Sequence, residues 1–194
     1  MFGSPLTITP AAGELIPLPQ AKGFVRVDGD ELDEELKLFA AAAAQDVEDQ
    51  TGLRLLNQRV QVSADRFADL EHFRVGPIRA VASIRYRDGA GVEQLLDADR
   101  YELQGAPLEQ GLRLSPGHNW PTASAVKGAI TVVLDVGYGE AAEEVPAKLR
   151  LAAYALFRGR FDAVARLRGS LELNRHFAGD AFNLTAGLGV RVGL

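Results

Sequence analysis

The spacing of apolar residues changes twice along the chain, and this change limits the possible folds more than any single motif does. Between residues 30 and 52, apolar residues recur every three or four positions, as on one face of an α-helix. Residues 57–138 instead form short runs that alternate between apolar and polar, which is typical of β-strands. The helical spacing returns over residues 146–158. The sequence therefore predicts an α+β fold in which two helices flank a β-module.

Both predicted helices have recognisable ends. Asp30 precedes the first helix and can cap its amides, and Gly52 can adopt the left-handed conformation that ends it. Val145–Pro146 begins the second helix, because proline is tolerated in the first turn. Neither helix is stable alone, so we expect their apolar faces to pack against each other. These faces consist of Leu32, Leu36, Phe39, Ala43 and Val47 in the first helix, and of Leu149, Ala152, Ala153, Leu156 and Phe157 in the second.

Turns rich in glycine and proline divide the β-module into about five to seven short strands, which suits an antiparallel meander. The last strand is the clearest, and it ends at Gly137–Tyr138–Gly139. One of its faces carries Ile130, Val132, Leu134 and Val136.

The two ends of the chain lack these patterns. Residues 1–22 hold four prolines, which predict an extended arm and disfavour a regular helix. Residues 163–173 favour a third helix, whereas residues 174–194 are glycine-rich and irregular, with a strand-like alternation over 188–194. The four prolines are Pro5, Pro10, Pro17 and Pro19.

Charge is distributed unevenly along the chain. The formal net charge is -5, from 21 basic and 26 acidic residues. Eight basic and three acidic residues lie from Ala147 onward, so the preceding part has thirteen basic against twenty-three acidic residues. An acidic body with a basic end can bind nucleic acid through that end, or dock the end on an acidic protein.

The composition also narrows the chemistry and the location. The chain has no cysteine, which excludes a disulfide framework, a thiolate metal site and a cysteine nucleophile. No stretch approaches the roughly 20 apolar residues that a membrane-spanning helix needs, and the N-terminus does not resemble a signal peptide. We therefore expect neither membrane insertion nor secretion.

No motif nominates a catalytic, cofactor-binding or metal site, so we expect a protein that is not an enzyme. His72, His118 and His176 lie far apart and lack ligand partners at short spacing. The carboxylates of residues 28–35 offer oxygen ligands for a cation but lack the pattern of a calcium loop. A solvated helix start explains them better.

Four segments together resemble the head-to-tail connector proteins of long-tailed phages, also called adaptor or head-completion proteins, which occur in gene transfer agents too. The resemblance covers roughly residues 23–162, and each segment also has a structural explanation as the start or end of an element. The segments are Val25-Arg26-Val27-Asp28, Glu48-Asp49-Gln50-Thr51-Gly52-Leu53-Arg54-Leu55, Trp120-Pro121, and Val136-Gly137-Tyr138-Gly139 followed by Val145-Pro146.

This resemblance implies a small antiparallel helical bundle with an inserted antiparallel β-domain and an extended C-terminal tail. It divides the chain into an N-terminal arm (1–22), a connector domain (23–162) and a basic tail (163–194). It further implies a structural protein of the virion or phage-like particle, made in the bacterial cytoplasm. Twelve copies would form a ring at the portal vertex, with packaged double-stranded DNA crossing its lumen. The portal protein and the next head-completion or tail protein would be its partners.

The resemblance assigns docking on the portal to the tail, although residues after Asp162 do not match the usual ending of the family. Spaced arginines would provide charge complementarity, and the alternation over 188–194 would let that segment add as a strand to the portal. The alternative is a nucleic-acid-binding protein whose same arginines neutralise phosphates. The predicted docking residues are Arg158, Arg160, Arg166, Arg168, Arg175, Leu188, Val190, Arg191, Val192 and Leu194.

Overall fold

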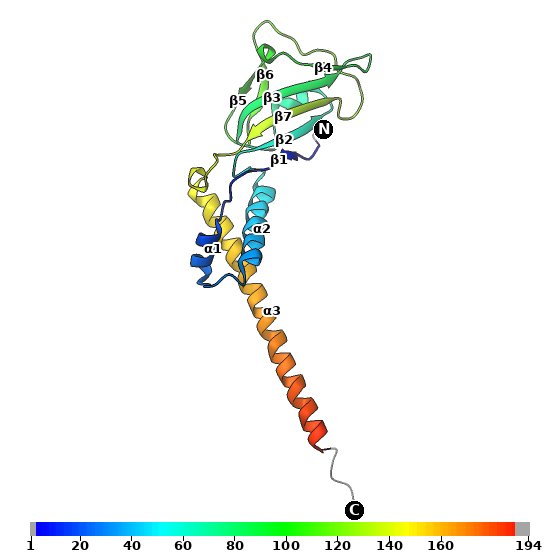
Figure 1. Cartoon of the computed structure of the whole chain (residues 1–194). Coiled ribbons are helices and arrows are strands. Elements are labelled where there is room, and N and C mark those ends of the chain that lie inside the picture. The colour runs from blue at the N-terminus through cyan, green and yellow to red at the C-terminus, as the bar shows by residue number, and fades with distance from the viewer. Residues whose placement is uncertain (1–2, 189–194) are drawn as a thin grey trace, which may run out of the picture.

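A computed structural model describes the backbone of residues 3–188 and the side chains of residues 3–167. It has two layers: a β-domain lies at one end, and a helical body lies next to it (Figure 1). The last helix projects from the helical body. The helices are α1 (Leu18–Val25), α2 (Asp33–Thr51) and α3 (Ala147–Leu188), with short 3-10 helices η1 (Phe67–Glu71), η2 (Ala98–Arg100) and η3 (Ala142–Glu144). The strands are β1 (Leu6–Thr9), β2 (Gln58–Ala64), β3 (Ile78–Arg87), β4 (Glu93–Leu95), β5 (Tyr101–Gln104), β6 (Gly111–Leu114) and β7 (Ile130–Val136).

The β-domain is built on an antiparallel sheet with the strand order β1-β2-β7-β3-β4. β7 pairs with β2 and with β3, so the strand that is clearest in the sequence occupies the centre. The antiparallel pairing is as predicted, but the meander is wrong, because the last strand lies between β2 and β3. Val60 lies opposite Leu134, and Val62 lies opposite Val132, which puts the apolar residues of both strands on one face. That face is covered by η1 and by the hairpin of β5 and β6, and it forms the first core.

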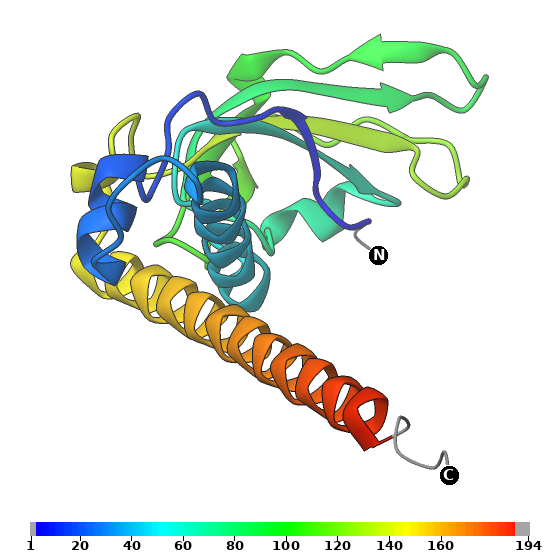
Figure 2. The ribbon, with the colours of Figure 1, turned by 60° about the horizontal axis from the view of Figure 1, so that its bottom comes forward.

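The helical body has a separate core. α2 and α3 run in opposite directions and pack against each other, and α1 lies against both (Figures 1 and 2). Phe157 of α3 and Leu36 of α2 are fully buried there. Phe24 of α1 packs on Tyr154 of α3, with ring centroids 5.0 Å apart. The predicted α+β class and the packing of the two amphipathic helices are confirmed. One member of the predicted faces is wrong, because Ala152 is exposed on the side of α3 away from α2.

α2 lies within the predicted range of 30–52, but its start differs from the prediction. Leu32 occupies the cap position, and no side chain caps the helix, so the capping role predicted for Asp30 is wrong. Asp30 contributes its backbone carbonyl, which accepts from the Asp33 amide. The C-terminal prediction is confirmed, because Gly52 is left-handed with φ of 73°.

The N-terminal arm is more regular than predicted. β1 adds as an edge strand to β2, and α1 follows where we expected no helix. Proline did not prevent this helix, because Pro17 precedes it and Pro19 stands in its first turn, where a backbone N–H is not needed. The arm thus crosses from the sheet to the helical body.

The second predicted helix is much longer than 146–158. α3 continues without a break through Gly159, where a glycine costs only about 1 kcal/mol relative to alanine. The predicted third helix is part of α3, and the backbone of residues 174–188 is helical where we predicted irregular structure. Residues 189–194 lie outside the described part of the chain. No helix within the described residues combines the length and apolarity needed to cross a membrane.

Candidate assembly surfaces

The segment after α2 joins the helical body to the sheet through a partly buried carboxylate. Glu48 Oε1 accepts hydrogen bonds from the Leu55 amide at 2.8 Å and from Gln58 Nε2 at 3.0 Å. Its second oxygen, Oε2, lies 3.5 Å from Arg54 Nη1. Thr51 Oγ1 donates to the Val47 carbonyl and accepts from the Leu53 amide, which tightens the turn between these groups. The segment Glu48–Leu55 therefore fixes the joint between the two layers.

Burial makes the Glu48 carboxyl harder to ionise. Desolvation raises its pKa, although the hydrogen bond from the Leu55 amide, the charge of Arg54 and the hydrogen bond from Gln58 act in the opposite direction. A raised pKa alone does not indicate catalysis, because structural groups at such joints are shifted too.

The segment after β7 forms the other half of the joint. The Gly137 amide donates to the Pro77 carbonyl at 3.0 Å, and the Tyr138 amide donates to the Leu55 carbonyl at 3.3 Å. Gly137 has φ of 118°, a conformation that a side chain would strain. The Asn57 amide in turn donates to the Gly139 carbonyl at 2.8 Å. These hydrogen bonds tie the segment after β7 to the segment after α2.

Trp120, which belongs to one of the four segments that resemble the connector family, has a packing role. Its ring stacks on Phe67 of η1, with centroids 4.9 Å apart and planes within 8°. Phe67 also contacts Tyr86 of β3 edge-on. The tryptophan thus closes one side of the β-domain core.

Two of the arginines predicted to dock on a partner are bound within the subunit. Arg158 Nε lies 3.1 Å from both carboxylate oxygens of Asp162, and its Nη1 donates to the Phe24 carbonyl at 3.3 Å. Arg160 donates to Asp46 of α2. These contacts fasten α3 to α1 and α2.

Arg166 is exposed on α3 beyond these contacts. The remaining predicted docking side chains lie outside the described part of the structure, so their role stays a prediction. They are Arg168, Arg175, Leu188, Val190, Arg191, Val192 and Leu194.

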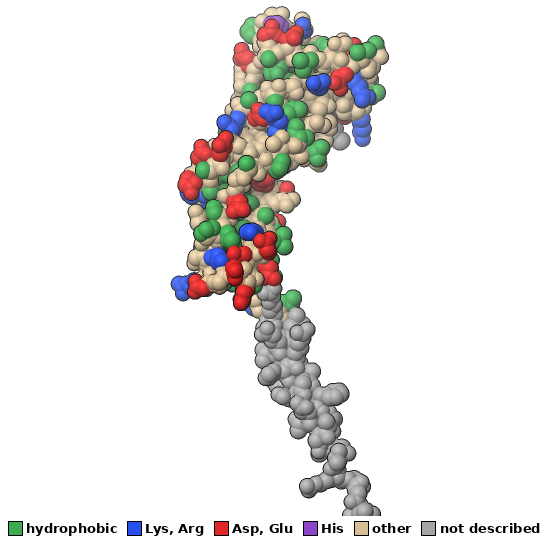
Figure 3. Space-filling view, in the orientation of Figure 1, with side chains coloured by type: hydrophobic (Ala, Val, Ile, Leu, Met, Phe, Trp, Pro, Cys, Tyr) green, Lys and Arg blue, Asp and Glu red, His purple; other side chains and the backbone are tan. Residues whose placement is uncertain are grey.

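Acidic side chains gather at the end of the helical body from which α3 projects (Figure 3). Asp28, Asp30 and Glu31 are exposed there. Asp33 binds Lys22 of α1 at 2.6 Å, and Glu34 binds Lys37 at 2.7 Å. Among the side chains of residues 3–167, no group of three His, Asp or Glu residues is placed to hold a metal ion.

A cleft of about 440 Å³, hereafter the α2 cleft, lies between the N-terminal arm and α2. Ala41 and Ala44 line its helical wall, and Leu15 lines the opposite wall. Glu48 and Arg54 reach it from the joint, and Arg54 Nε is buried without an acceptor among the described atoms. Sequence reasoning missed this cleft. The signal in the sequence was the run of five alanines at 40–44, because Ala43 packs in the core of the helical body while Ala41 and Ala44 line the cleft.

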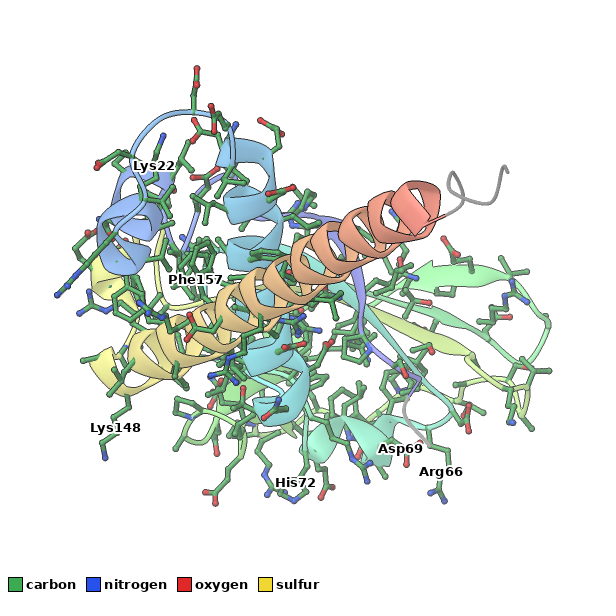
Figure 4. The ribbon with its side chains drawn as sticks, turned by 90° about the horizontal axis from the view of Figure 1, so that it is seen from below. Lys22, Arg66, Asp69, His72, Lys148 and Phe157 are labelled. Carbon is green, nitrogen blue, oxygen red and sulfur yellow. The ribbon has the colours of Figure 1, made fainter. Side chains whose placement is uncertain are left out.

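α3 presents a second exposed face, hereafter the α3 outer face, made of Lys148, Leu151, Ala152, Ala155 and Gly159. Leu151 is 70% exposed, more than the other exposed leucines of the body. An added Cβ at Gly159 would meet no atom within 4 Å. Lys148 points away from the helical body, whereas Phe157 points into it (Figure 4).

Neither a protein-family model nor a curated protein sequence matches the chain. Solved structures do match it. A chain of the neck of an empty gene transfer agent particle, computed with C6 symmetry, superimposes with a TM-score of 0.70 at 18% identity, over 82% of this chain and 84% of that one. A chain of the native particle's neck, computed with C12 symmetry, gives 0.66 at 20% identity, with the same coverage of each chain.

A chain from the virion of a native gene transfer agent particle gives a TM-score of 0.68 at 21% identity, again over 82% of this chain and 84% of that one. At these identities the likeness establishes a shared fold. It agrees with the resemblance to connector proteins stated from the sequence, as far as the fold is concerned.

Proposed function

We propose that this chain is a structural subunit of the neck of a tailed phage or a gene transfer agent-like particle, and that it has no catalytic role. The fold that it shares with the neck chains over most of both lengths carries this proposal. The segments that resemble the connector family, at Glu48–Leu55 and Val136–Gly139, form the joint between the layers. Glu48 and Arg54 reach the α2 cleft, but they are paired with each other there. The geometry suits a rigid building block.

In this proposal twelve copies form a ring beneath the portal, extend the DNA channel, and receive the next head-completion or tail protein on the far face. The C12 symmetry applied to one of the similar necks, and the C6 symmetry applied to another, support a ring whose subunit number is a multiple of six. A subunit with two firmly joined layers can hold neighbours at a fixed angle, which a closed ring requires.

The distal part of α3 and the residues after it would reach the portal. α3 has 42 residues and is therefore about 63 Å long. Its distal part projects past α1 and α2 (Figures 1 and 2), and an isolated helix gains most of its stability from packing on a partner. Arg158 and Arg160 are occupied within the subunit, so docking depends on the basic and apolar residues from Arg166 onward.

Two truncations test this docking. Removing residues 174–194 should abolish attachment to the portal protein in a pull-down, while the unfolding temperature of the body stays unchanged. Removing only residues 189–194 separates the two modes: loss of attachment indicates edge pairing by the terminal strand, and retained attachment indicates docking by the helix. Attachment of the intact chain should weaken as salt rises. If the protein that lacks residues 174–194 still attaches fully, a docking role for the tail is refuted.

The second candidate function is nucleic-acid binding by the same basic segment. The excess of basic residues after Ala147 favours it, whereas the ion pairs of Arg158 and Arg160 remove two of the available charges. Titrating full-length protein with duplex DNA at low salt distinguishes the two. Steeply salt-dependent binding supports this candidate, and no binding eliminates it.

A further inference from the structure

The helical body exposes two faces on opposite sides. Arg160 of α3 binds Asp46 of α2, so Asp46 marks the side of α2 that faces α3. Because a helix has 3.6 residues per turn, the opposite side of α2 carries Lys37, Ala41 and Ala44. These three residues line the α2 cleft. The α3 outer face likewise lies across α3 from Ala153, which is fully buried against the body. The order through the body is therefore cleft, α2, α3 and α3 outer face.

Each of these faces leaves apolar surface in solvent. Leu151 protrudes from the α3 outer face, with the small residues Ala155 and Gly159 next to it on the helix. On α2, Leu38 stands one turn before the cleft residue Ala41 and is 65% exposed. The cleft, at about 440 Å³, is large enough to admit a leucine side chain. One face therefore protrudes, whereas the other is hollow.

Charge also differs between the two faces. Lys148 is an exposed cation on the α3 outer face. Glu14 and Asp49 line the α2 cleft as exposed acids. Both cations that line it are paired, Lys37 with Glu34 and Arg54 with Glu48. Opposite charges on two faces of one chain favour contact between different faces of two copies and disfavour contact of a face with itself.

We propose that a second copy of this chain docks its α3 outer face against the α2 cleft, with Leu151 entering the cleft and Lys148 beside Glu14 and Asp49. Because the two faces differ and lie on opposite sides of the subunit, the contact is head-to-tail. Repetition of such a contact gives a ring when the rotation between neighbours divides a full turn evenly, as in the proposed ring. This inference rests on the proposed function for the ring and assigns the contact that builds it.

Cysteine crosslinking tests the contact directly, because the chain has no cysteine of its own. Leu151→Cys and Ala41→Cys proteins, full-length and mixed under oxidising conditions, should give dimers that hold one copy of each. The double variant should give a ladder of linked oligomers. A matched control, Leu151→Cys mixed with Val126→Cys in the β-domain, should stay unlinked. Three results would overturn the proposal: Leu151→Cys protein that crosslinks to itself, linkage to Val126→Cys as strong as linkage to Ala41→Cys, or no linkage at any protein concentration.

A steric variant provides a second, independent measurement. Gly159→Trp adds bulk where an added Cβ meets nothing in the subunit, so the unfolding temperature should not fall. It should weaken self-association, measured by sedimentation, by about tenfold or more. Gly89→Trp, in the turn after β3 and equally free of neighbours, serves as the control. Unchanged association of Gly159→Trp refutes this contact alone; whether the chain sits in a particle neck is decided separately by locating it in the particle.

Discussion

Gly137 shows how strongly single residues determine the joint between the two layers. With φ of 118°, it turns β7 toward the helical body, and an added Cβ would lie 2.7 Å from the Asn57 nitrogen and nearer still to the Leu56 carbonyl. We expect Gly137→Ala to lower the free energy of unfolding by at least about 2 kcal/mol. Urea denaturation measures this.

Gly89→Ala is the matched control for that substitution, because Gly89 has no atom within 4 Å of the added Cβ. It should change the free energy of unfolding by less than about 0.5 kcal/mol. Equal effects of the two alanines would mean that the turn at Gly137 does not constrain the joint.

Glu48 makes the joint sensitive to pH. Its folded-state pKa is raised above the ordinary value of 4.5, so the folded chain holds this proton more tightly than the unfolded chain does. The stability contributed by protonated Glu48 is therefore complete below pH 4.5 and is lost as pH rises through the raised pKa. Glu48→Gln does not titrate, so the advantage of the natural protein over this variant should shrink as pH rises.

Urea denaturation of both proteins at several values between pH 4 and pH 7 measures that difference. An advantage of the natural protein that grows with pH would mean that Arg54 and the amide of Leu55 outweigh desolvation of Glu48.

At the scale of elements, the helical body depends on a few large side chains between α1, α2 and α3. Phe157 is fully buried there, and its ring centroid lies 6.4 Å from that of Phe24. Phe157→Ala should therefore cost about 3–5 kcal/mol of unfolding free energy. Val126→Ala, at a side chain that is 48% exposed, should cost less than about 0.5 kcal/mol, and thermal melts compare the two.

Elements with strong periodicity could be predicted from the sequence, and those decided by their surroundings could not. The spacing of Leu36, Ala43 and Val47 identified α2, and the alternation in β7 identified the central strand. α1 was missed because four prolines in the arm outweighed a short helix that is held by contacts such as Tyr154 Oη to Gln20 Oε1 at 2.7 Å. Those contacts come from residues more than a hundred positions away.

The candidate surfaces were predictable to a smaller extent. The sequence identified the basic character of the C-terminal part, but it did not reveal that Arg160 meets Asp46, which lies 114 positions earlier. Nor did it reveal the α2 cleft, because a cleft depends on how the arm crosses α2, and the pattern of either segment alone does not fix that crossing. The length of α3 was underestimated because Gly159 and the glycines beyond it were weighted as helix ends.

For the whole molecule, the division of charge argues for assembly over tight nucleic-acid binding. The part before Ala147 carries thirteen basic and twenty-three acidic residues, and an acidic surface facing DNA repels it. In the proposed ring such a surface lets packaged DNA pass, while the basic α3 faces protein neighbours. The same division provides opposite charges for the contact between the α3 outer face and the α2 cleft.

In the proposed function, this chain builds the neck ring of a tailed particle. An image of the intact particle at the portal vertex, in which this chain is identified by its sheet and its long α3, tests it most directly. We expect a ring of twelve copies directly beneath the portal, with α3 directed toward the portal protein. Density for this chain elsewhere in the particle, or its absence from the neck, would contradict the proposed function.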